Sequence, residues 1–130
     1  NKTFYEKNRD SYLFFLTRLD QEIKADLRKK SSPYFMIFHP FLSYFADDYG
    51  LVQIAVESEG KSPTAKDLKS VIHNGKVHHV SVIFTQKQQG KGAAEIIAAE
   101  LKAGLVDVDP MGADYSSTMR SISRALSSND

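Results

Sequence analysis

The stretch YFMIFHP, residues 34–40, decides the fold of this 130-residue chain. Its first five residues are apolar without alternation, which is typical of a strand that is buried on both faces of a sheet. The proline at its end cannot continue the interior of a strand and fixes the backbone of the following turn. The stretch therefore predicts a central strand with a histidine, His39, at its carboxyl-terminal end.

Three further apolar segments follow this strand, each separated from the next by a segment with helical features. Ser62 before Pro63 is typical of a helix start, and Asn74 before Gly75 of a helix end. Strands that alternate with helices predict a parallel sheet with right-handed crossovers, so the expected fold class is α/β with helices on both faces of a four-stranded parallel sheet. The other expected strands are 51–56, 80–84 and 105–108, and the expected helices are 41–49, 62–72, 91–102 and 114–126.

Residues 2–30 carry the pattern of one long amphipathic helix, with apolar residues at near-helical spacings: Phe4, Tyr12, Phe15, Leu16, Leu19, Ile23 and Leu27. At ~1.5 Å per residue this helix would be roughly 40 Å long, more than the width of a small domain. We expect its first turns, up to about Tyr12, to be either frayed or covered by an intermolecular contact, such as a dimer formed through this helix.

Composition limits the classes of function. The chain has 42% hydrophobic residues and a net charge of +1, which fit one core and argue against a nucleic-acid partner. It contains no cysteine, so any metal site must use His, Asp, Glu or backbone oxygen. Because the chain opens on Asn1 inside a predicted helix, without an initiator Met, we expect it to be part of a longer precursor.

Ligands of parallel α/β sheets bind beyond the carboxyl ends of the strands, so the residues that follow each strand are the candidates for function. An imidazole and a carboxylate, from His39 and Asp109, suit Zn²⁺ or Mn²⁺ and could equally form an acid–base pair. The alternative is that His39 caps the next helix and that Asp109 accepts backbone N–H groups in an Asp-Pro turn. The residues after the four strands are His39, Glu57, Thr85 with Gln86, and Asp109.

Two other motifs are weaker candidates. His73, His78 and His79 crowd the turn before the third strand, at the opposite end of the sheet, where a solvated or capping cluster is more common than a structural metal site. Gly90-Lys91-Gly92 precedes a helix and could cradle a phosphate, but it lacks the length and the Lys-Ser/Thr ending of a P-loop.

The segment FHPFLSYFADDYGL, residues 38–51, resembles the region around the third metal ligand of the zinc/manganese substrate-binding proteins of ABC importers, cluster A-I. The later segments match in the same order: SPTAKDL at 62–68, VIF at 82–84, the AAEII core of 91–101 and VDPM at 108–111. The likeness covers nearly the whole chain. It implies a carboxyl-terminal α/β lobe, residues 31–130, preceded by a bridging helix, residues 1–30.

The resemblance also implies a function. Such a protein is no enzyme: it captures Zn²⁺ or Mn²⁺, with Fe²⁺ also accepted by this kind of ligand set, and delivers the ion to an ABC permease. His39 and Asp109 would be the metal ligands of this lobe, and a missing amino-terminal lobe would supply two histidines. The location would be periplasmic or extracytoplasmic, with the signal peptide in the missing part. The rival is a flavodoxin-like enzyme or nucleotide-binding domain that binds phosphate or a cofactor at residues 90–92.

The expected site has one geometric difficulty. If the strand order is the common 2-1-3-4, the first and fourth strands lie two spacings apart, roughly 9–10 Å. Metal–ligand bonds are only about 2 Å long, so the turns that carry His39 and Asp109 must arch toward each other.

Overall fold

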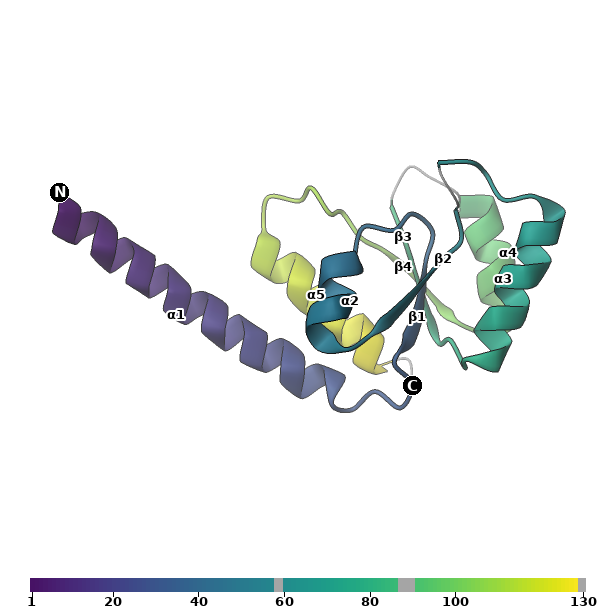
Figure 1. The fold of residues 1–130 in the computed structure, drawn as a ribbon, viewed down its shortest axis with the longest axis horizontal. Coiled ribbons are helices and arrows are strands. Elements are labelled where there is room, and N and C mark those ends of the chain that lie inside the picture. The colour runs from purple at the N-terminus through teal and green to yellow at the C-terminus, as the bar shows by residue number, and fades with distance from the viewer. Residues whose placement is uncertain (58–59, 87–90, 129–130) are drawn as a thin grey trace.

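A four-stranded parallel sheet forms the centre of the lobe, and one long helix projects from it (Figure 1). The structure is a computed structural model that describes residues 1–57, 60–86 and 91–128. The elements, in chain order, are α1 (Lys2–Leu27), β1 (Tyr34–Ile37), α2 (Ser43–Tyr49), β2 (Val52–Ala55), α3 (Ala65–Val77), β3 (Val82–Thr85), α4 (Lys91–Leu101), β4 (Gly104–Asp107) and α5 (Tyr115–Ser128). The predicted fold class and number of strands are therefore confirmed.

Every neighbouring pair of strands is parallel, as the sequence predicted, and the strand order is β2-β1-β3-β4, the common order considered above. Helices α2 and α5, with the end of α1, cover one face of the sheet, and α3 and α4 cover the other (Figure 1). The sheet therefore separates two hydrophobic clusters. Each cluster needs apolar side chains from the same strands.

Strand β1 supplies both clusters because successive side chains of a strand point to opposite faces. Phe35 and Ile37 belong to the cluster under α1, α2 and α5, whereas Met36 belongs to the cluster under α3 and α4. All three side chains are fully buried. The unbroken apolar run in the sequence thus reflects a central strand that is covered on both sides.

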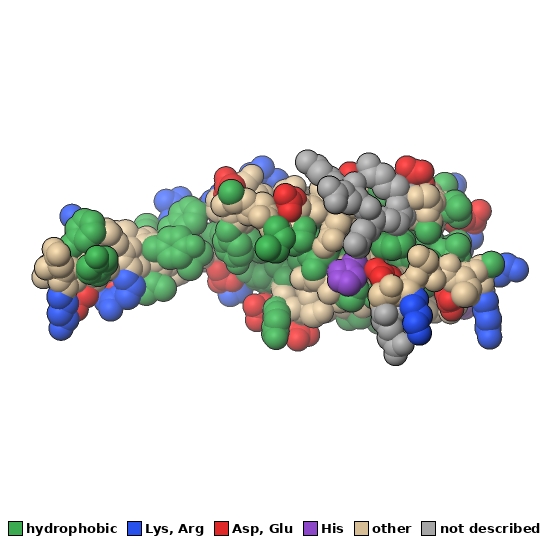
Figure 2. Space-filling view, turned by 90° about the horizontal axis from the view of Figure 1, so that it is seen from above, with side chains coloured by type: hydrophobic (Ala, Val, Ile, Leu, Met, Phe, Trp, Pro, Cys, Tyr) green, Lys and Arg blue, Asp and Glu red, His purple; other side chains and the backbone are tan. Residues whose placement is uncertain are grey.

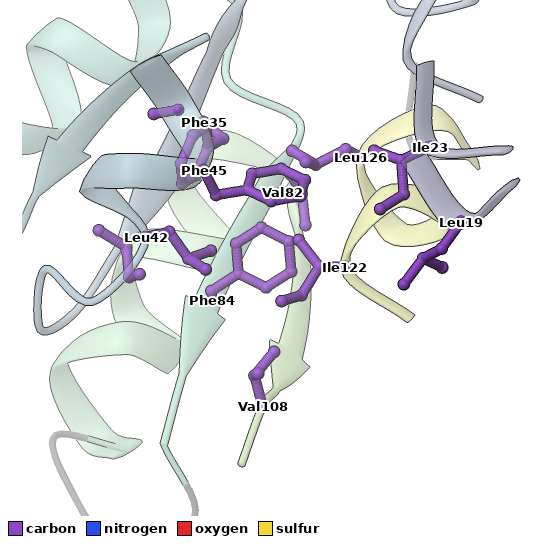
Figure 3. Packing of buried hydrophobic residues seen from close by; sticks show 12 residues of the cluster. Leu19, Ile23, Phe35, Leu42, Phe45, Val82, Phe84, Val108, Ile122 and Leu126 are labelled. Carbon is purple, nitrogen blue, oxygen red and sulfur yellow. The ribbon is translucent and has the colours of Figure 1, made fainter. Parts of the chain in front are cut away.

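Helix α1 touches the lobe only near its carboxyl-terminal end. Leu19 and Ile23 are its buried residues, at 2% and 3% exposure, and they lie against Ile122 and Leu126 of α5 (Figure 3). Phe4, by contrast, is 61% exposed, and hydrophobic side chains line the projecting turns (Figure 2). The helix ends at residue 27, three residues before the predicted end. None of the helices in the described part of the chain has the length and apolar character of a membrane-spanning segment.

Three carboxylates of α1 join this helix to the lobe. The Tyr49 hydroxyl of α2 donates a hydrogen bond to Asp20 at 2.9 Å. The pKa of Tyr49 is raised, chiefly because the hydroxyl is partly buried and secondly because of this hydrogen bond. The other two carboxylates bind α5. Arg120 Nε donates to Glu22 at 2.7 Å, and the buried Ser123 hydroxyl donates to Asp26 at 3.0 Å.

Helix α3 differs most from its prediction. Its first residue is preceded by Thr64, not Ser62, because Thr64 and Asp67 form a reciprocal capping box: the Asp67 N–H donates to Thr64 Oγ1 at 3.3 Å, and the Thr64 N–H donates to Asp67 Oδ2 at 2.8 Å. Nor does Gly75 end the helix. It is buried inside it, and an added Cβ there would lie 2.5 Å from Leu101 Cδ1. The other element ends lie within three residues of their predicted positions.

The buried contact between α1 and α5 predicts a large effect of truncation at Ile23. Ile23→Ala should lower the free energy of unfolding by ~2–4 kcal/mol, because it leaves a cavity between the helix and the lobe. The matched control is Leu13→Ala, at a residue that is 53% exposed on the same helix. Its effect should stay within ~0.5 kcal/mol. Urea unfolding of both variants measures the difference, and equal losses would contradict this account of how α1 is docked.

The carboxylates of α1 predict acid sensitivity. The hydrogen bond from Lys24, then that from Tyr49, lowers the pKa of Asp20, and the hydrogen bond from Arg120 lowers the pKa of Glu22. A carboxyl group whose pKa is lower in the folded state stabilises the fold above its unfolded pKa and loses that effect as pH falls through its folded pKa. The free energy of unfolding should therefore decrease as pH falls below about 4.

Denaturant titrations between pH 7 and pH 3 test this expectation. Glu22→Gln should make the decrease in acid shallower, because it removes one of the linked protons. Glu6→Gln, on the projecting part of the helix, is the control and should leave the curve as in the parent. A parent protein whose stability does not fall in acid would contradict the proposed linkage.

Candidate metal centre

The loops that follow the strands meet at one edge of the sheet. His39, Glu57 and Asp109 each stand two residues beyond the end of β1, β2 and β4, respectively. Figure 2 looks onto this edge and shows a histidine at the surface beside an acidic side chain. The three positions predicted from the strand ends thus lie on the same side of the molecule, where parallel α/β sheets bind ligands.

His39 contacts Glu57. The imidazole Nδ1 lies 3.2 Å from Glu57 Oε2, with the His39 side chain 47% exposed and the Glu57 side chain 13% exposed. Backbone hydrogen bonds hold Glu57 and the residue before His39: the N–H of Phe38 donates to the carbonyl of Phe84 at 2.9 Å, and the N–H of Glu57 donates to the carbonyl of Phe38 at 3.0 Å. The sheet pairing therefore continues one step past the strands and sets these side chains side by side.

His39 does not cap the next helix, so that alternative reading is wrong. Leu42 precedes the first residue of α2, and its N–H donates to the side-chain oxygen of Gln53 at 3.2 Å. The imidazole thus lies at the edge of the sheet, where its Nδ1 contacts Glu57.

Asp109 forms the Asp-Pro turn that the sequence offered as an alternative. Its Oδ1 accepts a hydrogen bond from the N–H of Met111 at 3.0 Å, and its backbone carbonyl accepts one from the N–H of Gly112 at 3.2 Å. The side-chain contact uses one of the two carboxylate oxygens. Asp109 is exposed, and Val108 before it is anchored to the carbonyl of Thr85 at 2.8 Å.

The structure brings His39 to Glu57, whereas β3 lies between the strands that lead to His39 and to Asp109. Within residues 1–57, 60–86 and 91–128, no group of three or more His, Asp or Glu side chains could hold a metal ion. At this edge the described residues offer the contacting pair His39 and Glu57 and, apart from them, Asp109. They do not form a complete coordination shell.

Sequence reasoning missed two contacts at this edge. Glu57 is one of the predicted strand-end positions, but its pairing with His39 is not predicted, although their strands are neighbours in the common strand order considered above. The second contact is a hydrogen bond from the Thr85 hydroxyl, which is almost fully buried, to Asp107 on β4. Asp107 sits inside the predicted strand, and no pattern in the sequence distinguished it.

The weaker motifs lie elsewhere. The His78 ring stacks on Tyr34 with 3.9 Å between centroids, and His79 adopts a φ of +52° directly after α3. His73 is exposed within α3, His78 is the residue that follows this helix, and His79 is exposed one residue later. The candidate phosphate motif at 90–92 lies partly outside the described residues. Within them, Gly92 is exposed in the first turn of α4.

Comparisons with known proteins identify the family. Residues 1–129 match the family model described as "Zinc-uptake complex component A periplasmic" (ZnuA), and the chain belongs to this family. The zinc uptake protein ZnuA of Bacillus subtilis is 30% identical over 105 residues, which are 79% of this chain and 33% of that protein. The chain thus spans about one third of the length of this relative. These matches do not favour the flavodoxin-like alternative.

Solved structures show the same likeness. A crystal structure of ZnuA superposes with a TM-score of 0.90 and 38% identity over 96% of this chain and 49% of that one. A deletion mutant of ZnuA with zinc bound superposes with a TM-score of 0.86 and 38% identity, over 96% of this chain and 48% of that one. The fold described above is therefore the fold of about half of such a protein.

Proposed function

We propose that this chain is the carboxyl-terminal lobe, with its bridging helix, of an extracytoplasmic substrate-binding protein that captures a divalent transition metal for an ABC permease. The family match supports this proposal, as does the zinc named in the relatives. The observation that carries it is a half-exposed histidine, His39, directly after the sheet-bonded Phe38 at the edge where parallel α/β sheets bind ligands. Its role would be binding and release of the ion, without catalysis.

The proposed ligands from this lobe are His39 and Asp109. A neutral imidazole and a carboxylate suit Zn²⁺ best, and with two histidines from an amino-terminal lobe they would also accept Mn²⁺ or Fe²⁺. Two ligands cannot close a tetrahedral shell, so water would complete it in this lobe alone. The ion is cargo in this proposal, and the turns after β1 and β4 would approach each other around it.

Residues 1–30 would serve as the helix that bridges the lobes, and residues 31–130 as the metal-binding lobe. The exposed side chains of the projecting turns support this division, because a stripe of large apolar residues normally has a cover. In the whole protein the amino-terminal lobe would cover this stripe. In the isolated 130-residue chain a second copy would cover it, by forming a dimer through α1.

The ligand assignment predicts the effect of two substitutions in the whole protein. His39→Ala and Asp109→Ala should each weaken zinc binding by more than about 10-fold, because groups that merely support a metal ligand are already worth about 10–100-fold. Calorimetry measures the affinity, and circular dichroism checks that the lobe stays folded. His73→Ala, at an exposed histidine outside the site, is the control. If both ligand variants bind zinc like the parent, His39 and Asp109 are not its ligands.

The projecting helix predicts self-association of the isolated chain. Sedimentation should show a dimer that is lost when residues 1–11 are removed, because the deletion takes away Phe4 and Tyr5, which are 61% and 67% exposed. Hydrogen exchange should be faster in the first turns than from Leu19 to Leu27. A monomer whose first turns are as protected as the docked turns would show that α1 needs no second copy.

A further inference from the structure

We propose that Glu57 is a positioning residue for metal capture: it holds His39 in the tautomer and orientation in which Nε2 is free to bind the ion. The inference rests on the proposed function, since it concerns the same histidine. It begins from the contact between His39 Nδ1 and Glu57 Oε2 at 3.2 Å, within the range of a hydrogen bond.

A positioning residue should be more buried than the ligand that it orients, and Glu57 is more buried than His39. The Glu57 side chain is 13% exposed, and that of His39 is 47% exposed. The carboxylate is therefore the inner partner, and the imidazole is the outer one, which faces incoming ligands. A metal ion that approaches from solvent would meet the imidazole first.

The carboxylate is also fixed in place by the sheet. The N–H of Val56 donates to the carbonyl of Ile37 at 2.9 Å, and the N–H of Glu57 donates to the carbonyl of Phe38 at 3.0 Å. Val56 is itself buried, at 4% exposure. These bonds extend the pairing of β2 with β1, so the sheet sets the backbone positions of Glu57 and of Phe38, the residue before His39.

The chemistry of the pair then selects one tautomer. An ionised carboxylate can only accept hydrogen bonds, so the Nδ1 that faces it must carry the proton. In a neutral imidazole the other nitrogen, Nε2, keeps its lone pair and can coordinate a metal. Glu57 would act on the ion only through His39, unlike a residue that binds the ion directly.

The first test needs no metal. Long-range ¹H–¹⁵N spectra of the 130-residue chain, at a pH where the ring is neutral, report which nitrogen of His39 carries the proton. The parent should show the Nδ1–H tautomer, and Glu57→Ala should shift His39 toward the Nε2–H tautomer that free imidazole side chains prefer. Glu100→Ala, at an exposed glutamate paired with Lys76, is the control and should change nothing at His39. If Glu57→Ala leaves the His39 tautomer unchanged, the proposal is wrong.

The second test is a double-mutant cycle on zinc affinity in the whole protein. Glu57→Ala alone should weaken binding by about 10–100-fold. In a His39→Ala background the same substitution should have almost no further effect, because Glu57 acts through the missing ring. A further loss of similar size in that background would show that Glu57 is itself a metal ligand, and would overturn the positioning role. A parent protein that binds no zinc would refute the proposed function, while the metal-free test would still decide the role of Glu57.

Discussion

The burial of β1 on both faces is the constraint on which the rest of the structure depends. This strand lies between β2 and β3, and its side chains alternate between two hydrophobic clusters. A polar residue at Phe35, Met36 or Ile37 would lie in one cluster or the other without water, at a cost of several kcal/mol, on the order of the whole stability of a domain. The chain can become polar only where the strand leaves the core, and the first polar side chain after it is His39.

The same constraint explains the attachment of α1. The cluster under α2 and α5 is closed by only two fully buried residues of that helix, Leu19 and Ile23, so apolar area alone gives a modest contact. Three carboxylates flank these two residues, Asp20 toward α2 and Glu22 with Asp26 toward α5. They add direction to the contact, because each hydrogen bond is satisfied in one register only. A helix attached in this way projects in a fixed direction from the lobe, with its aromatic side chains far from the sheet (Figures 1 and 2). Rigid projection is the property that a connection between two lobes requires.

The sequence predicted the topology well and local details less well. Parallel pairing and the long helix follow from the hydrophobic pattern, which reflects burial. The strand order does not follow from that pattern, and the order considered above is the common one of such sheets. The limits of α3 do not follow from the local signals Ser62-Pro63 and Asn74-Gly75, because a nearby capping box overrides the first and packing overrides the second. Thr64 is the N-cap because it forms reciprocal hydrogen bonds with Asp67. The helix continues through Gly75 because the absence of a side chain there leaves space for Leu101. Local propensity predicts an end only where packing does not decide it.

The candidate site likewise has one part that the sequence pattern predicts and another that depends on contacts in the fold. Strand ends identified His39, Glu57 and Asp109 as edge residues, but which of them meet depends on strand adjacency. Neighbouring parallel strands lie about 5 Å apart, so residues two positions beyond β1 and β2 touch, whereas β4 is two spacings away from β1. In the proposed site, the lobe would present an imidazole that its own sheet has already oriented, and the Asp109 carboxylate would reach the same ion only if the turns move. Such a division would suit a protein that binds its cargo and then releases it: one ligand would be held ready by the fold, and the other would complete the site as the ion arrives.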